Sequence, residues 1–359
     1  MQTSNPPTNP VFVALSGGVD SAVAAHLLKP QFSNLTGISH RHWPESRCCS
    51  TECVDRCAKQ CLELDIPYFA VDCVVEFTKI IIDNFVSNYE RGLTPNPCVL
   101  CNENIRFDWM IRKHFQKQNL PVPKDYKLAT GHYARVEERA GRFYLLRGRD
   151  KTKDQSYMLH RLSQEELSHT LFPLGNFFKS EVREMALKFN LKSAKIGDSQ
   201  DLCFVQDTYQ NFIRQYSEKF YAPGNFVDQS GNILGQHKGL VFYTRGQRNG
   251  LGLSGGPWYV LKLNCQENTV VLSSRDALLE KRFRADRLRW IYPEIPDGLE
   301  CRVQTRYHTQ ETNCRIFHEG KDQIVVELAT PSSEVSPGQS SVFYANDEVI
   351  GGGIITGFA

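Results

Sequence analysis

Short apolar runs alternate with helix-like stretches over the first half of the chain. The apolar runs at residues 11–15, 35–39, 68–71 and 127–130 predict buried strands. The stretches at residues 21–28, 51–64 and 77–89 predict helices, and the first of them ends before a proline. This alternation predicts a doubly wound α/β domain that binds its ligand at the carboxyl ends of the strands.

The pattern changes near residue 205. Residues 211–220 predict one more helix, and short alternating runs separated by Gly and Asn turns follow from residue 224. The runs at residues 303–307, 314–317, 324–328 and 341–344 predict strands of a small all-β barrel. We therefore expect a disordered tail at 1–10, a catalytic domain at 11–205, a central domain at 206–274 and a β-barrel domain at 275–359.

The composition fits a globular protein of 359 residues, with 41% hydrophobic and 23% charged positions. No apolar run approaches the roughly 18 residues that span a membrane. Residues 1–10 lack the basic and apolar regions of a secretory signal. Twelve cysteines without an export signal indicate a reducing compartment. We expect a cytoplasmic protein with no membrane partner.

The first predicted strand leads into the loop Ser16-Gly17-Gly18-Val19-Asp20-Ser21 and then into a helix. The two glycines permit a tight turn that aims backbone N–H groups at one anion, and the helix adds its positive end. Asp20 would help to hold a magnesium ion that bridges phosphates. The loop lacks the lysine of the GxxxxGK[ST] pattern. It indicates an ATP-using enzyme that adenylates its substrate, and the alternative is an ordinary strand-to-helix turn.

Most cysteines have the pattern of packing residues. Cys49, Cys53, Cys57 and Cys61 recur every four residues, with Cys48 beside the first. On a helix they form one stripe about 18 Å long, which cannot surround a single zinc ion. Small apolar packing therefore suits them better. The cysteines at positions 73, 265, 301 and 314 lie in apolar or strand-like contexts and are interpreted in the same way.

Cys98, Cys101 and Cys203 lie in different surroundings. Cys98 and Cys101 follow a proline-stiffened segment, and a helix is predicted to start near Asn102. A thiol at a helix N-terminus has a lowered pKa and is partly thiolate at neutral pH. Cys203 lies in a polar turn before Phe204. By themselves these patterns are compatible with a zinc site, a redox pair or an iron–sulfur cluster.

Two segments concentrate positive charge, although the net charge is only +2. Residues 135–153 carry seven Lys/Arg against three acids, and residues 281–290 carry five against one. Basic runs with interleaved aromatic residues suit a phosphate backbone. The alternative interpretation is a solvated surface.

A series of motifs covers residues 10–355. In chain order they are SGGVDS, RCCS, TPNPxxxCN, GHYAR, KDQSYML, GDSQDLCF, GQRNGLG, PWYV, TRY and SPGQSSVFY. The first resembles the PP-loop of ATP pyrophosphatases. The whole series resembles the bacterial and organellar tRNA-specific 2-thiouridylases. The resemblance implies a PP-loop catalytic domain (Rossmann-like, of the adenine nucleotide alpha-hydrolase type), a small central domain and a C-terminal β-barrel.

The resemblance also implies a reaction. ATP adenylates the C2 oxygen of wobble uridine 34 in tRNAs for Lys, Glu and Gln, and sulfur then displaces AMP. The products are 2-thiouridine, AMP and pyrophosphate. Cys203 matches the cysteine that receives a persulfide from a sulfur-relay donor protein. Cys101 matches its partner nucleophile, which closes a disulfide with Cys203 as sulfur leaves.

Binding residues carry over by motif. Those implied for ATP, with Mg²⁺, are Ala14, Leu15, Ser16, Gly17, Gly18, Val19, Asp20, Ser21, His40 and Gly131. His40 occupies a position where the family usually has methionine. Those implied for tRNA are Asn96, Pro97, Cys98, His132, Lys153, Asp154, Gln155, Arg306, Tyr307 and Gln339. The first three would meet the target base outside its stack.

Cys98 departs from the aspartate that many members of the family have. Cys98, Cys101 and Cys203 would supply three thiols for a [4Fe–4S] cluster with one open iron site. The persulfide route needs no such cluster. Two further alternatives are another PP-loop adenylating ligase, such as one that forms amides, and a non-catalytic iron–sulfur module that binds RNA.

Overall fold

The computed structural model describes residues 9–43, 51–195 and 202–359. Most of the predicted tail, together with Cys48, Cys49 and the RCCS motif, lies outside the described residues. The chain divides into two compact units. Unit 1 comprises residues 1–81, 98–206 and 347–349, and unit 2 comprises residues 82–97, 207–346 and 350–359.

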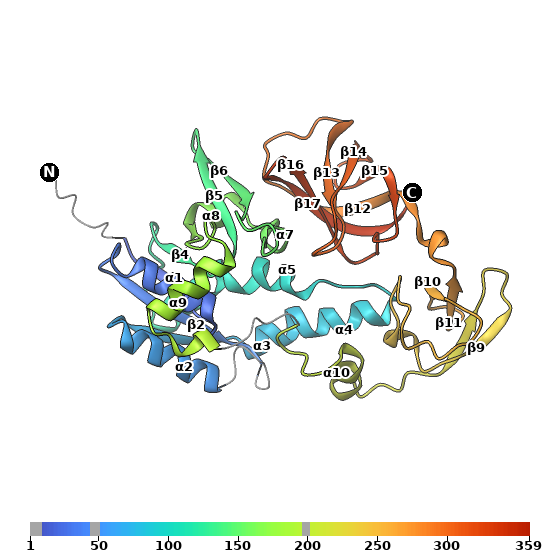
Figure 1. The fold of residues 1–359 in the computed structure, drawn as a ribbon, viewed down its shortest axis with the longest axis horizontal. Coiled ribbons are helices and arrows are strands. Elements are labelled where there is room, and N and C mark those ends of the chain that lie inside the picture. The colour runs from blue at the N-terminus through green and yellow to red at the C-terminus, as the bar shows by residue number, and fades with distance from the viewer. Residues whose placement is uncertain (1–8, 44–50, 196–201) are drawn as a thin grey trace. The chain divides into compact units, whose positions relative to one another are not determined.

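Unit 1 is built on a parallel sheet (Figure 1). Its strands, in spatial order, are β3 (Tyr68–Asp72), β2 (Leu35–Arg41), β1 (Val11–Ala14), β4 (Lys127–Ala129) and β7 (Thr170–Leu171). Every neighbouring pair is parallel. The order turns back between β1 and β4, which is where open α/β sheets bind ligands. The predicted α/β fold of this half is confirmed.

Helix α2 (Thr51–Glu63) carries the cysteine stripe against the sheet. Cys53, Cys57 and Cys61 are all buried, and burial raises the pKa of both Cys57 and Cys61 to about 12. The Cys61 sulfur fills the space above Gly37 of β2, because a Cβ there would lie 2.2 Å from it. The packing interpretation is confirmed for these three cysteines. It is wrong for Cys265 in unit 2, whose exposed thiol donates to the Glu90 carbonyl at 3.8 Å.

The helices after β3 begin earlier than predicted. A helix starts at Val74, where Asp72 Oδ1 accepts the backbone N–H at 3.1 Å, and the predicted helix 77–89 is divided by a π-helical turn. Its parts are α3 (Val74–Phe77), the turn Thr78–Ile82 and α4 (Asp83–Glu90). Helix α5 spans Pro97–Cys101 and therefore does not start near Asn102. Proline suits the first helical position because it has no N–H to leave unsatisfied.

The remaining elements of unit 1 follow the same order in the chain as in the sequence. They are α1 (Val19–Leu28), a π-helical turn Asn102–Arg106, α6 (Asp108–Lys117), β5 (Ala134–Arg139), β6 (Arg142–Arg147), α7 (Ser156–Leu159), α8 (Gln164–His169), α9 (Lys179–Lys188) and a 3-10 turn Lys192–Lys195. Strands β5 and β6 form an antiparallel hairpin from most of the first basic run.

Unit 2 contains helix α10 (Tyr209–Tyr216), two 3-10 turns and two β structures. The smaller sheet has the order β10 (Tyr259–Asn264), β11 (Thr269–Ser273), β8 (Gly224–Val227) and β9 (Ile233–His237). The 3-10 turns are Leu240–Phe242 and Arg275–Leu278. The predicted helix at 211–220 is confirmed, although it begins and ends earlier.

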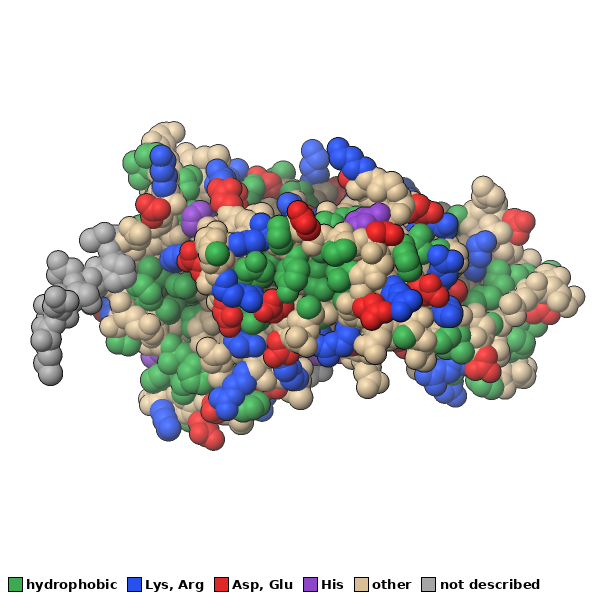
Figure 2. All heavy atoms as spheres, turned by 90° about the horizontal axis from the view of Figure 1, so that it is seen from above, with side chains coloured by type: hydrophobic (Ala, Val, Ile, Leu, Met, Phe, Trp, Pro, Cys, Tyr) green, Lys and Arg blue, Asp and Glu red, His purple; other side chains and the backbone are tan. Residues whose placement is uncertain are grey.

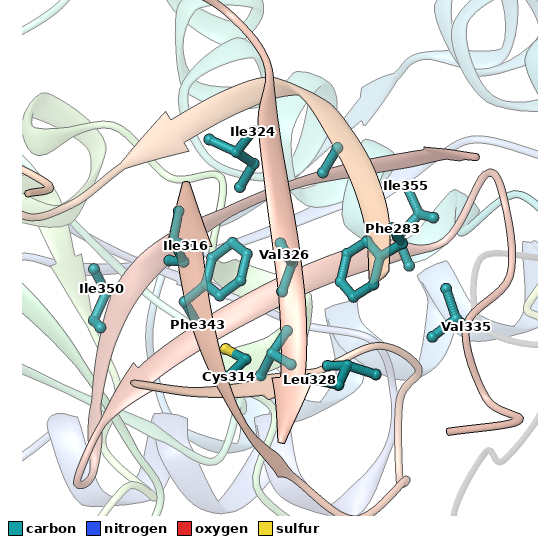
Figure 3. Packing of buried hydrophobic residues seen from close by; sticks show 12 residues of the cluster. Phe283, Cys314, Ile316, Ile324, Val326, Leu328, Val335, Phe343, Ile350 and Ile355 are labelled. Carbon is teal, nitrogen blue, oxygen red and sulfur yellow. The ribbon is translucent and has the colours of Figure 1, made fainter. Parts of the chain in front are cut away.

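The second β structure of unit 2 is a closed barrel. Its strands are β12 (Glu280–Trp290), β15 (Ile324–Ser332), β14 (Thr312–His318), β13 (Leu299–Gln304), β16 (Ser340–Ala345) and β17 (Glu348–Phe358). Strand β12 also pairs with β17, which closes the ring. Phe283, Ile316, Val326 and Phe343 fill its interior (Figure 3). The predicted barrel is confirmed.

Candidate functional site

The loop after β1 forms an anion-binding turn. Gly17 has a φ of +71°, which favours glycine, and Gly18 is the N-cap of α1. Ser21 Oγ donates to the Gly18 carbonyl at 3.3 Å and accepts from the Ser16 N–H at 3.2 Å. Within the described chain, no side chain caps this end of α1. The first N–H groups of the helix therefore remain available to an anion.

Gly131, directly after β4, packs against this loop. A Cβ at Gly131 would lie 2.8 Å from Ser21 N and 2.9 Å from the Asp20 carbonyl carbon. Only glycine allows this approach without moving the loop. The structure thus brings Gly131 and residues 14–21 together at the point where the strand order reverses.

Asp20, in the first turn of α1, is bound from a distant segment. Lys179 Nζ lies 2.7 and 2.8 Å from its two carboxylate oxygens, and Tyr133 Oη donates to it at 2.8 Å. Lys179 is only 7% exposed. The sequence analysis missed both partners, because a contact spanning 159 residues leaves no local pattern. The loop that lacks its own lysine acquires one from the start of α9.

The end of β2 places two histidines beside Cys203. His42 Nε2 lies 3.2 Å from Cys203 Sγ, and the His42 ring stacks on His40 with centroids 4.7 Å apart. His42 is 1% exposed, and it also packs against Phe77 at 4.3 Å. Cys203 is half-buried. An imidazole in contact with a thiol can accept its proton, so His42 is a functional candidate that the sequence analysis did not identify.

Cys101 lies at the last residue of α5, not at a helix N-terminus, whereas Cys98 lies in the first turn. This corrects the predicted placement of Cys101. Cys101 is buried and Cys98 is half-buried. Cys73, after β3, bonds the Arg41 carbonyl through both its N–H and its thiol. Burial raises the pKa of Cys73, and nearby Cys101 raises it further. Cys101 therefore lies near the ends of β2 and β3.

The described residues include no group of three or more His, Cys, Asp or Glu side chains arranged to hold a metal ion. Cys98, Cys101 and Cys203 are all described, so the structure does not gather them into such a group. The arrangement does not fit a [4Fe–4S] cluster. Asp20 is likewise engaged by Lys179 and Tyr133, so in this arrangement it does not offer Mg²⁺ an open carboxylate.

His132 is buried beneath the loop region. Its Nδ1 lies 2.8 Å from Thr130 Oγ1, and its Nε2 lies 3.5 Å from Arg106 Nη1. Since arginine can only donate, Nε2 accepts and Nδ1–H donates. Burial first, and then the Arg106 charge, lower the pKa of His132 to about 3. His132 is thus a neutral, fixed ring, and its predicted contact with tRNA stays a prediction.

Acid should destabilise the protein through His132. The unfolded chain takes up a proton below the ordinary pKa of 6.5, whereas the folded state does so only near 3. Stability should therefore fall as pH drops from 6.5, by up to about 1.4 kcal/mol per pH unit from this residue. Denaturant unfolding at several pH values measures the slope. The His132→Gln variant should show a shallower slope, and an unchanged slope would contradict this account.

The KDQ motif is largely internal. Buried Asp154 accepts from Arg147 at 2.7 Å, from the Gly148 N–H at 2.9 Å and from Ser156 at the start of α7. Gln155 Oε1 accepts the Tyr133 N–H at 3.1 Å. Lys153 is half-buried. Asp154 and Gln155 therefore hold the backbone around the hairpin, and a direct contact with tRNA remains a prediction for all three.

Two distant motifs meet in unit 2. Buried Gln339 donates to the Thr94 carbonyl at 2.8 Å and to the Pro95 carbonyl at 3.2 Å. The Thr94 N–H donates to the Pro337 carbonyl at 2.9 Å, and Gly338 leaves no room for a Cβ against Thr94. The SPGQ segment thus shapes the segment that precedes Cys98. Asn96 is half-buried and Pro97 is buried.

Arg306 and Tyr307, also predicted to contact tRNA, follow β13 and are half-buried. Arg306 Nη1 lies 3.6 Å from a Glu334 carboxylate oxygen.

Carboxylates match much of the charge in the basic runs. Lys151 and Arg135 pair with Asp347, Arg139 pairs with Glu348, and Arg284 pairs with Glu319. On the face drawn in Figure 2, cationic and acidic side chains are interspersed. An RNA backbone would have to compete with these carboxylates. None of the described helices has the length and apolar character needed to cross a membrane.

A parallel sheet with an uncapped phosphate loop at its switch point defines a nucleotide-binding α/β enzyme. Accordingly, residues 9–207 match the family model for the tRNA methyl transferase HUP domain, and ATP binding follows from this PP-loop domain. Residues 210–274 match the tRNA methyl transferase PRC-barrel domain, and residues 280–355 the aminomethyltransferase beta-barrel domain.

Relatives align over nearly the whole chain. The tRNA-specific 2-thiouridylase MnmA of Lachnoclostridium phytofermentans is 40% identical over 96% of this chain and 99% of its own. That of Carboxydothermus hydrogenoformans is 39% identical over 96% and 97%. The chain belongs to the tRNA-specific 2-thiouridylase family. It is a sulfurtransferase despite the methyl transferase wording of the models, and its phosphate loop suits ATP-driven activation, which methyl transfer does not need.

One solved structure, the U34-tRNA thiolase NcsA from Methanococcus maripaludis with its [4Fe-4S] cluster, is 20% identical over 59% of this chain and 66% of that chain, with a TM-score of 0.35. A likeness at this level carries no argument about the site.

Proposed function

We propose that the chain thiolates tRNA at the wobble uridine. ATP would adenylate the C2 oxygen of uridine 34 in tRNAs for Lys, Glu and Gln, and sulfur would then replace that oxygen, with release of AMP and pyrophosphate. One observation carries the proposal. The phosphate loop follows β1, and the His42–Cys203 pair adjoins the end of the neighbouring strand β2, so activation and sulfur chemistry share one edge of the sheet.

The activating half would use the loop and Lys179. The uncapped N–H groups of α1 would bind the pyrophosphate of ATP, and the Lys179 ammonium would neutralise its charge. His40, buried at the end of β2, would contact adenine. Any magnesium ion would be held chiefly by the phosphates of ATP, and we assign no step to it.

The sulfur-transfer half would use Cys203, Cys101 and His42. A donor protein would load Cys203 as a persulfide. Its terminal sulfur would attack C2 and expel AMP with the former C2 oxygen, because adenylation turns a poor leaving group into a good one. The Cys101 thiolate would then attack Cys203 Sγ and form a disulfide, leaving the sulfur on the base. His42 would accept the Cys203 proton when the thiol is loaded.

The substrate would be bound by residues of both units. We propose a catalytic domain at 11–205, a central domain at 206–274 and a barrel domain at 275–359. Asn96, Pro97 and Cys98 would meet the base, while Lys153, Arg306 and Tyr307 would contact the tRNA backbone. His132, Asp154, Gln155 and Gln339 would act by holding these segments in place, because their described bonds are internal.

The proposal is tested with the full chain, ATP, a persulfide donor and tRNA transcripts that lack modification. Pyrophosphate release should require both ATP and tRNA, and digestion of the tRNA should yield 2-thiouridine by mass spectrometry. Amide-forming ligase activity would instead show incorporation of ammonia or an amine. A non-catalytic RNA-binding module would release no pyrophosphate. Either result would overturn the proposal.

The [4Fe–4S] route is tested in the same assay. The protein is purified without oxygen, assayed for iron and sulfide, and compared with Cys98→Asp. We expect Cys98→Asp to thiolate tRNA without iron, because the three thiols are not gathered for a cluster. Activity that follows iron content and is lost in Cys98→Asp would favour the cluster instead.

A further inference from the structure

The barrel of unit 2 contains a pair of thiols that the proposed reaction does not use. Cys301 on β13 and Cys314 on β14 occupy directly opposed positions of the antiparallel pair. Their sulfur atoms lie 3.6 Å apart. Cys314 is 4% exposed and belongs to the barrel core, where its sulfur is visible beside Leu328 (Figure 3). Cys301 is half-buried.

The backbone already satisfies what a disulfide requires. Directly opposed residues of an antiparallel pair have Cα atoms about 4.5–5.5 Å apart, inside the range of about 4.4–6.8 Å seen in disulfides. Sulfur atoms in van der Waals contact need only side-chain rotation to reach bonding distance. The strands would not have to shift register.

A cavity gives small molecules access to both thiols. Its volume is about 690 Å³, and Cys301 and Cys314 are both among its lining residues. The rim carries paired charges, with Arg315 bound to Glu300 and Lys281 at 3.6 Å from Glu327. Charges of both signs at the mouth suit a small molecule that itself carries amines and carboxylates. A folded protein oxidant would not enter a space of this size.

We propose that Cys301 and Cys314 form a covalent modification site for low-molecular-weight peptide disulfides. The Cys301 thiolate attacks one sulfur of the disulfide, forms a mixed disulfide and releases one peptide thiolate. Cys314 loses its proton and attacks Cys301 Sγ, which expels the second peptide thiol. The two cysteines are oxidised to a disulfide, and one peptide disulfide is reduced to two thiols.

The new bond would link the two strands that flank the segment 305–311. That segment contains Arg306 and Tyr307. The disulfide would therefore brace a hairpin that the proposed function assigns to tRNA, although formation of the bond does not depend on that function. Cytosolic disulfides are chiefly transient and redox-sensing, which matches a site that opens again when peptide thiols are abundant.

The test treats the full chain with oxidised glutathione and maps cysteines by non-reducing tryptic digestion. Cleavage after arginine leaves Cys301 in the peptide 290–302 and Cys314 in the peptide 307–315. We expect these peptides to appear as one linked species that is lighter by two hydrogens, and thermal unfolding to occur a few degrees higher. Dithiothreitol should reverse both changes.

Two single variants separate the steps. Cys314→Ser should trap glutathione on Cys301, whereas Cys301→Ser should leave Cys314 unmodified, because Cys314 is buried. Circular dichroism and thermal unfolding of the reduced variants confirm that they fold. A wild-type chain that forms no 290–302/307–315 link would overturn the proposal, as would glutathione trapped equally on Cys314. Thiolation of tRNA, assayed separately, bears on the proposed function alone.

Discussion

Replacing Cys203 with serine should abolish formation of 2-thiouridine while tRNA-dependent release of pyrophosphate continues. Serine is nearly isosteric, but its hydroxyl cannot carry a sulfane sulfur. The phosphate loop after β1 does not include Cys203, so adenylation should proceed. Loss of a covalent nucleophile typically lowers turnover by at least about a thousandfold. Mass spectrometry of the tRNA nucleosides and a pyrophosphate assay on the same sample measure the two halves separately.

Three companion variants sharpen this result. Cys101→Ser should also lose thiolation, because the disulfide that releases sulfur cannot form. His42→Asn should slow persulfide loading roughly a hundredfold at neutral pH and recover at higher pH, where the thiol ionises unaided. Cys265→Ser, which changes an exposed thiol, should match the wild type. Full thiolation by Cys203→Ser would exclude this cysteine as the sulfur carrier.

Replacing Lys179 with methionine should stop the activating half of the reaction. Lys179 brings a buried ammonium to within 2.7 Å of Asp20 in the first turn of α1, beside the N–H groups expected to bind pyrophosphate. Removing one charge-stabilising donor from such a site typically costs about 100- to 1,000-fold in rate. Pyrophosphate release should fall by this factor, and thiolation should fall with it.

The control must separate phosphate binding from loss of the ion pair. Asp20→Asn/Lys179→Met removes both charges, so it should fold as well as the wild type and remain inactive. Lys192→Met changes a lysine whose side chain is 87% exposed and should leave both activities intact, since surface ion pairs contribute little. If Lys179→Met folds normally and releases pyrophosphate at the wild-type rate, Lys179 has no role in binding ATP.

The fold could largely be predicted because its strongest elements are local patterns. The strands and helices of the first half are apolar runs of the right length, and their alternation determines the parallel sheet. Strand β17 was not predicted, because Gly351 and its two glycine neighbours have low strand propensity. They are required by close packing, since a Cβ on Gly351 would lie 2.5 Å from the Arg289 carbonyl. Strand β12 was hidden in the same way by its arginines.

The site divides along the same line. The phosphate loop is contiguous and could be predicted residue by residue, with Gly131 added by resemblance. Lys179, Tyr133 and His42 reach their partners across the fold, and no spacing in the sequence indicates such contacts. Cys101 was placed at the wrong end of its helix, because the proline expected to precede the helix instead begins it.

The hydrogen bonds from Gln339 to Thr94 and Pro95 limit how far this enzyme can be divided. A fragment that ends at residue 205 would retain the phosphate loop, Lys179 and the reactive cysteines, yet the segment leading to Cys98 would lose the template that shapes it. Such a fragment should still recognise a nucleotide but not position a base. Recombination that exchanges the C-terminal barrel between distant relatives would therefore have to exchange the TPNP segment with it.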